Sequence, residues 1–271
     1  MITTVKPSTA FLEKYIDCFY IFEKQGKDVS NYIAFPHFLT GLSFFQKVNV
    51  YRDDFAIHIE ENENINAYIE LLGKYKTPVS VKCAGTFKEI SIIFKPFGIN
   101  RFIKNNYWAV APDFSQAFTE KNWLDFAQKL GEIEKPIEAI EGFLMDQFVE
   151  MEEISSLERS LMYFEKQEEK CTIAAIATKT GFGLKSFQRN FLKHMGCTPI
   201  DYRRLKYFRS ALNSKLQTQH KKSLTEITFE NHYFDQSYFI KEFRNFTNLN
   251  PRLFFKKVRM VDGDKIIWEL L

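Results

Sequence analysis

The sequence predicts an α+β protein: an N-terminal β-rich barrel or sandwich, a few helices after it, and a C-terminal all-α part. Three observations lead to this fold class. Short apolar runs bounded by turn residues fill residues 11–103, a pattern typical of strands. Apolar residues recur at helical spacing after Pro112. A helix–turn–helix pattern then occurs twice, about 52 residues apart. The chain of 271 residues is long enough for two domains, each with its own core.

The N-terminal strands are expected in runs of β-branched and aromatic residues that end at Gly, Pro or Asp. These runs are residues 15–22, 32–35, 42–45, 48–51, 55–59, 79–83 and 89–94. Residues 60–76 are ambiguous, because Ile65, Ile69 and Leu72 could also share one face of a helix. Many short strands at close spacing favour a sandwich or a barrel.

Helical spacing replaces the strand pattern in the next segment. A second helix is expected from Pro136, because proline suits the first turn of a helix. Residues 151–153 are interpreted as a linker into the last domain. The helical apolar series before the break at Gly131 is Phe114, Phe118, Trp123, Phe126 and Leu130. We therefore expect a β-rich domain at 1–110, a helical connector or dimerisation region at 111–155, and a third domain at 156–271.

Charged residues are distributed unevenly along the chain. Residues 1–155 hold 16 Lys+Arg against 22 Asp+Glu, whereas residues 156–271 hold 21 against 12. An acidic half joined to a basic half indicates a polyanionic partner for the basic half, although charge alone cannot separate DNA from RNA or a membrane surface. The four cysteines are scattered without zinc spacing, so reduced thiols and no metal are expected. Residues 1–10 lack the apolar stretch of a signal peptide and no apolar run is long enough to cross a membrane, so we expect a cytoplasmic protein.

The repeat in the C-terminal half is the most informative feature of the sequence. Phe187-Gln-Arg-Asn-Phe191 corresponds to Phe239-Ile-Lys-Glu-Phe243, and Pro199 corresponds to Pro251. Each copy predicts a helix, a tight turn and a second helix, over residues 172–195 and 224–247. Expected N-caps are Thr172, Ser223 with Glu226 in a capping box, and Asp235. Simple packed helix pairs are the alternative. Nucleic-acid binding is favoured because residues 171–260 hold 17 Lys+Arg against 5 Asp+Glu.

The second copy contains Asp235-Gln-Ser-Tyr-Phe239 within the run 233–243, followed by Asn250-Pro-Arg-Leu-Phe254. These residues resemble the signature of the AraC/XylS family of transcription regulators. The resemblance covers residues 156–258. Two positions depart from it: Gly183 stands where a capping serine is usual, and His232 stands where the turn usually has glycine. More weakly, residues 92–102 resemble the cupin-like effector domain that precedes this module in some members.

The resemblance implies a sequence-specific DNA-binding transcription regulator with double-stranded DNA as its partner and no cofactor. It leaves a small-molecule effector and RNA polymerase open as further partners, and the chain open as monomer or homodimer. Residues 198–217 predict one long connecting helix of about 30 Å. Successive major-groove faces lie about 34 Å apart, so one chain could present two recognition helices to adjacent grooves.

The outward residues of the two recognition helices are the candidate base readers, with a solvated helix face as the alternative. They are Lys185, Ser186, Gln188, Arg189, Ser237, Tyr238 and Lys241. Other basic residues are expected to contact phosphates, which sets affinity without reading sequence. These are Lys193, Arg203, Arg204, Lys206, Arg244 and Arg252.

The role of the N-terminal half has three alternatives. It could sense a ligand in a largely apolar pocket, with Phe35, Phe44 and Phe94 as wall residues unless they are simply core. It could be a cupin-type metal enzyme, but its histidines His37 and His58 form no metal-binding pattern, and no catalytic residue is identified. It could serve only dimerisation in an architectural DNA binder.

Overall fold

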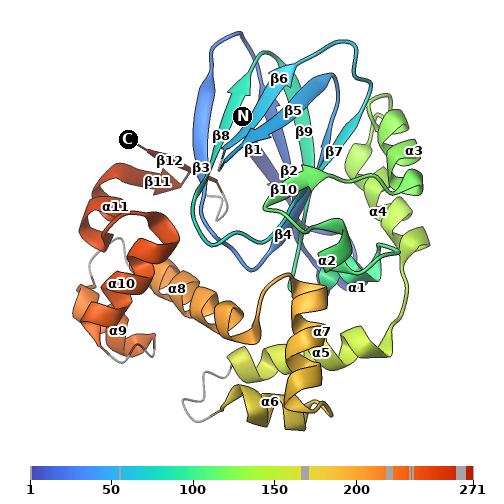
Figure 1. The fold of residues 1–271 in the computed structure, drawn as a ribbon. Coiled ribbons are helices and arrows are strands. Elements are labelled where there is room, and N and C mark those ends of the chain that lie inside the picture. Colours follow the sequence, from blue (N-terminus) through green and yellow to red (C-terminus); the bar gives the residue numbers. More distant parts are fainter. Residues whose placement is uncertain are drawn as a thin grey trace.

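The computed structural model describes residues 2–54, 56–165, 171–217, 222–231, 233, 235–260 and 267–270 (Figure 1). Its described strands form two six-stranded sheets. The first sheet has the order β1-β2-β9-β4-β7-β10, and the second has the order β11-β12-β3-β8-β6-β5. Neighbouring strands are antiparallel except β6 and β8, which are parallel. The two-sheet domain followed by a helical domain confirms the predicted fold class.

The first nine strands lie where apolar and β-branched residues gather. They are β1 (Ile2–Val5), β2 (Ile16–Lys24), β3 (Ser30–Ala34), β4 (Thr40–Phe45), β5 (Val48–Asp53), β6 (Ala56–Glu61), β7 (Tyr68–Leu72), β8 (Val79–Ala84) and β9 (Phe87–Phe94). The ambiguous segment 60–76 contains the strand β7. Its Ile69 and Leu71 are buried because β7 lies between β4 and β10 in the first sheet.

Three short helices lie in the N-terminal domain, and longer helices follow in the connector and in the C-terminal half. They are α1 (Ala10–Glu13), η1 (Gly98–Arg101), α2 (Tyr107–Val110), α3 (Lys121–Leu130), α4 (Pro136–Gln147), α5 (Glu152–Glu165), α6 (Ile173–Lys179), α7 (Leu184–Met195), α8 (Pro199–Gln217), α9 (Leu224–Glu230), α10 (Gln236–Thr247) and α11 (Pro251–Lys257). In Figure 1, α3 and α4 cover the first sheet on the side away from the second.

Two expectations about the connector are wrong. Phe114 and Phe118 do not lie on a helix, because Ser115–Ala117 form the edge strand β10, which pairs with β7. Glu152 and Glu153 of the expected linker at 151–153 instead open α5, so the boundary proposed at 155/156 falls inside a helix. Glu152 and Glu153 favour a helix start, since acidic side chains interact well with the amide end of a helix.

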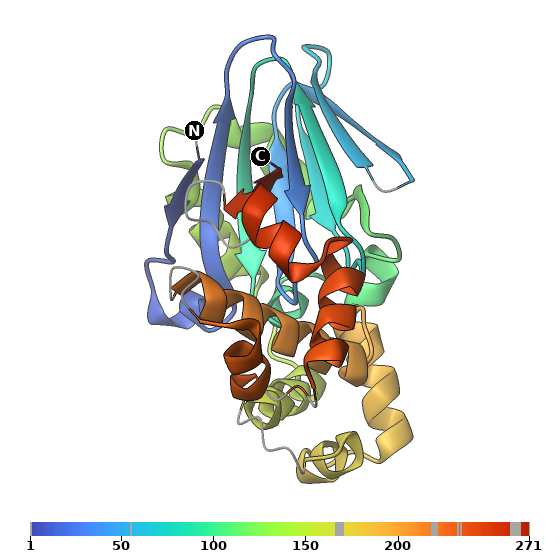
Figure 2. The ribbon, with the colours of Figure 1, turned by 90° about the vertical axis from the view of Figure 1, so that its left-hand side faces the viewer.

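The C-terminal domain is not purely helical. After α11 the chain forms β11 (Val258–Met260) and β12 (Ile267–Leu270), and β12 pairs antiparallel with β3 of the N-terminal domain. Figure 2 shows this end of the chain beside the sheets, with α11 in front of them. The end of the chain therefore joins the two domains through backbone hydrogen bonds.

Each helical unit also takes an aromatic residue from the N-terminal domain into its core. Phe97 packs edge-on against Phe191, with ring centres 5.1 Å apart. Phe35 packs against Phe254 of the second unit, again at 5.1 Å. Both N-terminal phenylalanines are almost fully buried. The two domains thus share their cores at the junction.

Candidate nucleic-acid interface

The first helix-turn-helix unit consists of α6 and α7. Thr172 caps α6 by accepting a hydrogen bond from the Ala175 amide at 3.1 Å. A turn through Gly181, with a positive φ of 83°, leads to α7. Gly183 is the N-cap of α7 and provides no side-chain hydrogen bond, as its departure from the family pattern predicts. Phe187 and Phe191 are fully buried, which anchors the inner face of α7.

The second unit consists of α9 and α10. Ser223 and Glu226 form the predicted capping box at the start of α9, at 3.2 and 2.6 Å. Asp235 caps α10 by accepting from the Tyr238 amide at 2.7 Å. Phe239 and Phe243 are buried beneath α10. His232 and Phe234, which belong to the turn, lie outside the described residues.

The outer faces of α7 and α10 carry all seven candidate base readers. Ser186 is half-buried, and the other six are exposed. The exposed readers are Lys185, Gln188, Arg189, Ser237, Tyr238 and Lys241. Within the described residues, Lys185, Arg189 and Lys241 form no ion pair. Their charged groups are therefore available to an outside partner.

The long helix α8 connects the two units. Its 19 residues span about 28 Å at the usual helical rise. The predicted apolar stripe is buried at Tyr202, Leu205 and Phe208 and continues through Ala211 and Leu212. Because the stripe packs against both units, α8 fixes the distance between the two recognition helices.

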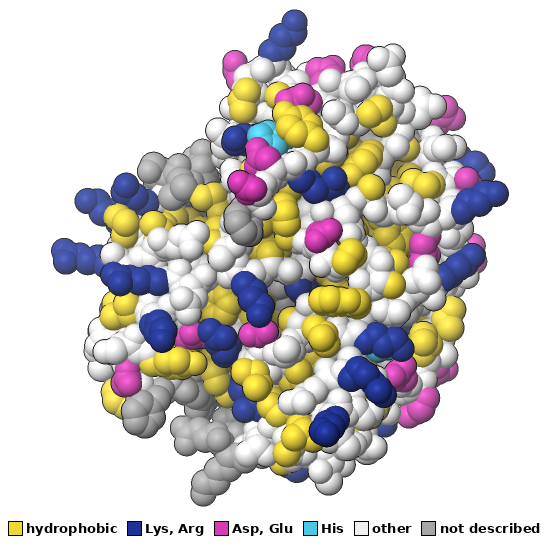
Figure 3. All heavy atoms as spheres, viewed as in Figure 1, with side chains coloured by type: hydrophobic (Ala, Val, Ile, Leu, Met, Phe, Trp, Pro, Cys, Tyr) yellow, Lys and Arg dark blue, Asp and Glu magenta, His cyan; other side chains and the backbone are white. Residues whose placement is uncertain are grey.

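The six residues expected to hold phosphates fall into three groups. Arg244 and Arg252 are exposed and have no ion pair within the described residues. Lys193 and Lys206 lie near carboxylates, at 3.6 Å from Glu153 and 3.6 Å from Glu165, respectively. In Figure 3, Lys and Arg side chains gather over α10 and α11 on the left of the molecule. Of the six, Arg244 and Arg252 are the two that are exposed.

Arg203 and Arg204 are half-buried and already have partners within the protein, so they are less available to a phosphate than Arg244 and Arg252. Arg203 donates to the Cys171 carbonyl at 2.8 Å. Arg204 forms a two-pronged ion pair with Glu242, at 2.7 and 2.8 Å. The Glu242 side chain is only 3% exposed, so this pair ties α8 to α10.

Sequence reasoning missed two buried charges that helical periodicity could have located. Glu242 lies three residues after Phe239, which places it on the inner face of α10. Arg209 likewise follows Leu205 by four residues and falls on the buried stripe of α8. Its guanidinium donates to the carbonyls of Phe35 at 2.6 Å and Pro36 at 2.8 Å. A charge on a buried face requires a partner, and here the partners lie on other elements.

A second polar contact joins the first unit to the N-terminal domain. The Asn100 amide donates to the His194 carbonyl at 2.8 Å, and Nδ1 of His194 lies 3.1 Å from Oδ1 of Asn100. Burial lowers the pKa of His194. Nε2 of the same ring lies 3.3 Å from Oε2 of Glu153, so His194 also contacts α5.

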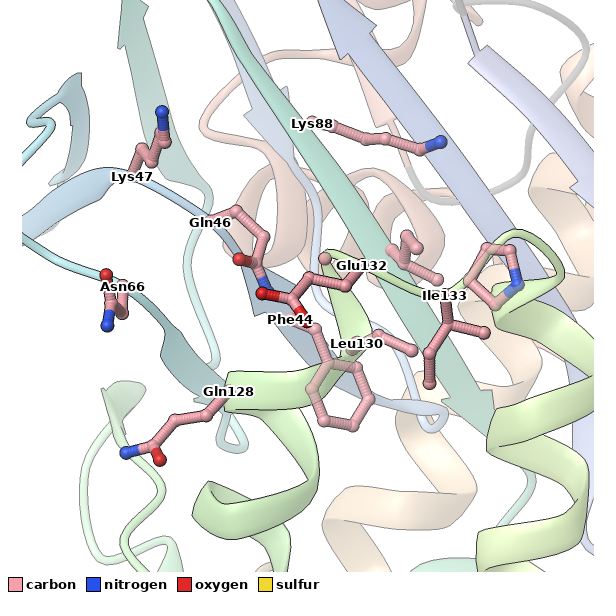
Figure 4. Close-up of a pocket in the computed structure, with 12 residues that line it drawn as sticks. Phe44, Gln46, Lys47, Asn66, Lys88, Gln128, Leu130, Glu132 and Ile133 are labelled. Atoms are coloured by element: carbon pink, nitrogen blue, oxygen red, sulfur yellow. The ribbon is translucent and has the colours of Figure 1, made fainter.

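The three candidate pocket phenylalanines lie in three different places. Phe44 lines a pocket of about 440 Å³ between the first sheet and the segment that follows α3. In Figure 4, Gln46, Gln128 and Glu132 surround this pocket with polar groups, and Leu130 and Ile133 add apolar ones. Phe94 is buried in the core beside Phe102, and Phe35 is buried at the domain junction. Only Phe44 of the three lines this pocket.

The two histidines considered for a metal have ordinary partners. Nδ1 of His37 accepts from the Leu39 amide at 2.9 Å, and His58 pairs with Asp53 at 2.8 Å. Within the described ranges, no group of three or more His, Cys, Asp or Glu residues could hold a metal ion. No described helix is both long and apolar enough to cross a membrane.

Comparisons with known proteins bear on the C-terminal half. Residues 176–257 match the family model of a helix-turn-helix domain, which confirms the helix-turn-helix units predicted from the repeat. No curated protein matches the chain. Among solved structures, ToxT from Vibrio cholerae O395 is similar at 13% identity over 90% of this chain and 97% of that chain, with a TM-score of 0.43. Unsaturated-fatty-acid-bound wild-type ToxT from Vibrio cholerae strain SCE256 is 12% identical over 86% and 93%, with a TM-score of 0.41.

Proposed function

We propose that this chain is a transcription regulator of the AraC type that reads two adjacent major-groove segments of DNA with α7 and α10. The match of residues 176–257 to a helix-turn-helix domain supports this proposal. The rigid helix α8 sets the distance between the two segments. Its length of about 28 Å is close to the roughly 34 Å between successive major-groove faces.

The observation that carries this proposal is that the outer faces of α7 and α10 present exposed basic side chains without ion-pair partners. Lys185, Arg189 and Lys241 are exposed and make no ion pair within the described residues. Arg189 has the fork of donors that suits a guanine edge, and Gln188 suits an adenine edge. Arg244 and Arg252 would then hold phosphates and set the salt dependence.

We further propose that the N-terminal domain makes the regulator responsive to a small molecule. The Phe44 pocket is the candidate effector site, because it combines apolar walls with a few polar groups, as small-molecule sites generally do. The shared cores at the junction give the N-terminal domain a physical route to both helical units. A cytoplasmic location, contact with RNA polymerase and the choice between monomer and homodimer stay predictions.

The test is selection of duplexes from a random pool by the full chain. We expect enrichment of a site with two conserved segments about 10 base pairs apart, and binding that weakens steeply with salt. Enrichment of a single segment would contradict two-groove reading. A thermal-shift screen of metabolites would follow. If the protein is a ligand-responsive regulator, at least one stabilising metabolite should also change its affinity for DNA. If it is only an architectural DNA binder, no metabolite should do both.

A further inference from the structure

A small cavity lies between the two sheets of the N-terminal domain. Its volume is about 60 Å³, and strands of both sheets contribute to its wall. Most of the wall is apolar, and its polar members are Tyr20, Tyr32, Ser43, Glu70 and Glu89. This inter-sheet cavity shares no lining residue with the Phe44 pocket, so it is a separate site.

The two carboxylates at the inter-sheet cavity differ in their counter-charges. Glu70 forms an ion pair with Arg52. Glu89 is only 2% exposed and has no ion pair within the described residues. The buried Lys24 donates to the Gly26 carbonyl at 3.3 Å. A buried carboxylate is costly without a counter-charge or a full set of hydrogen bonds, so Glu89 lacks what Arg52 gives Glu70.

The two oxygens of Glu89 are unequally satisfied. Oε1 accepts from the Tyr20 hydroxyl at 2.5 Å and from the Ser91 hydroxyl at 2.8 Å. Oε2 is buried and has no hydrogen-bond partner within the described residues. A proton on Oε2 would itself need an acceptor, and the same residues provide none within hydrogen-bond distance. Since buried polar atoms are almost always paired, the bare oxygen marks a place for a donor from outside the chain.

The chemistry of the wall selects a positively charged N–H donor. A carboxylate in a poorly solvated place binds a charged donor about twice as strongly as a neutral one. Hard metal ions need about six or more oxygen ligands, which a mostly apolar wall does not offer. A protonated primary amine has three N–H donors. The Glu89 carboxylate and the hydroxyl groups of Tyr20, Tyr32 and Ser43 provide acceptors for them.

The volume limits the occupant to a very small molecule. A water molecule takes up about 30 Å³ of liquid, so the inter-sheet cavity holds about two groups of that size. We propose that this cavity binds an ammonium ion or a short protonated primary amine, with Oε2 of Glu89 as its counter-charge. No residue of α7 or α10 takes part, so the site stands apart from the proposed function. The bound cation should stabilise the fold, because it binds a place that exists only between folded sheets.

Thermal unfolding of the full chain without DNA tests the site. The probes are ammonium, methylammonium, potassium and tetramethylammonium chloride, each at about 50 mM. Ammonium or methylammonium should raise Tm by about 3 °C or more relative to potassium. Tetramethylammonium has no N–H group and is too large, so it should behave like potassium. The dependence of Tm on concentration gives the dissociation constant, which we expect in the low millimolar range, about 1–10 mM.

Three variants locate the effect. Glu89→Gln keeps the shape but removes the charge, so it should weaken binding by about 10-fold or more. Tyr32→Phe removes one acceptor and should weaken binding by about 3-fold or more, which keeps the test valid if Glu89→Gln does not fold. Glu60→Gln is the matched control and should leave binding unchanged. Glu60 is exposed on β6 outside the cavity, where it accepts from Tyr51.

The proposal would be overturned if neither ammonium nor methylammonium raised Tm above its value in potassium. Equal stabilisation by tetramethylammonium would mean a general salt effect, which also contradicts it. Retention of the full shift by Glu89→Gln, or an equal loss in Glu60→Gln, would place the cation elsewhere on the protein.

Discussion

Arg189 and Arg252 are both exposed arginines of the helical domain, but they occupy different positions. Arg189 lies on the outer face of α7, whereas Arg252 lies in the first turn of α11. Arg189→Ala should weaken binding to the selected site by about 1–3 kcal/mol and relax preference at one base pair. Arg252→Ala should weaken all duplexes about equally and reduce the salt slope by about 1. Titrations of both variants against point-mutated sites would separate these outcomes. Uniform loss for Arg189→Ala would make it a phosphate contact.

Arg204 should matter for stability because its removal strands a buried carboxylate. Glu242 is 3% exposed and depends on the Arg204 guanidinium. Breaking such a pair costs several kcal/mol, and the partial exposure of Arg204 puts Arg204→Ala at about 2–3 kcal/mol. Urea unfolding would measure the loss. The control is the double variant Arg204→Met with Glu242→Leu, which removes both charges and should recover most of the stability. If Arg204 only faced DNA, its replacement by alanine would not destabilise the fold.

Glu89 gives the fold a pH dependence. It is 2% exposed between the sheets, and burial raises its pKa, with Glu70 adding to the effect. A raised pKa in the folded state means that stability falls as pH rises through that pKa. Glu89→Gln cannot ionise, so its stability relative to the natural chain should increase with pH. Urea unfolding of both proteins at about pH 5 and about pH 8 tests this, and a constant difference would contradict it.

At the scale of single elements, sequence patterns were sufficient wherever the pattern was local. Strands such as β4 and β9 show turn-bounded apolar runs, and Ser223, Asp235 and Pro136 mark helix starts by their own chemistry. The edge strand β10 was missed because three residues carry too little periodicity to stand out beside aromatics at helical spacing.

The turn after α7 packs closely against α2. Gly196 has a positive φ of 77°, and a Cβ there would lie 2.5 Å from the buried Tyr107 ring of α2. Gly196→Ala should therefore cost about 1–3 kcal/mol. Gly142→Ala is the matched control: Gly142 lies inside α4 with open space around it, so alanine should stabilise by about 0.5–1 kcal/mol. Equal effects of the two changes would argue against close packing of α7 on α2.

At the scale of the whole molecule, the sequence could not reveal how the domains share their cores. Phe35 and Phe97 were indistinguishable from other core phenylalanines, because their partners Phe254 and Phe191 are distant in sequence. The pairing of β12 with β3 could not be predicted for the same reason, because the two strands are separated by most of the chain. The internal partners of the two arginines of α8 assigned to phosphate, Cys171 and Glu242, could not be foreseen either, because they are defined only by tertiary packing.

The fixed length of α8 makes a prediction about operator spacing. A helix of 19 residues cannot stretch, so α7 and α10 can reach two segments only about 10 base pairs apart. Inserting about 5 base pairs between the segments should remove the contribution of one recognition helix. Inserting a full turn of about 10 base pairs should not restore it, since the same face of DNA is then too far away. Anisotropy titrations with these duplexes, and with the same insertions outside the site as controls, measure the effect. Recovery at the full-turn insertion would mean that the two segments are read by separate chains or through a flexible connection.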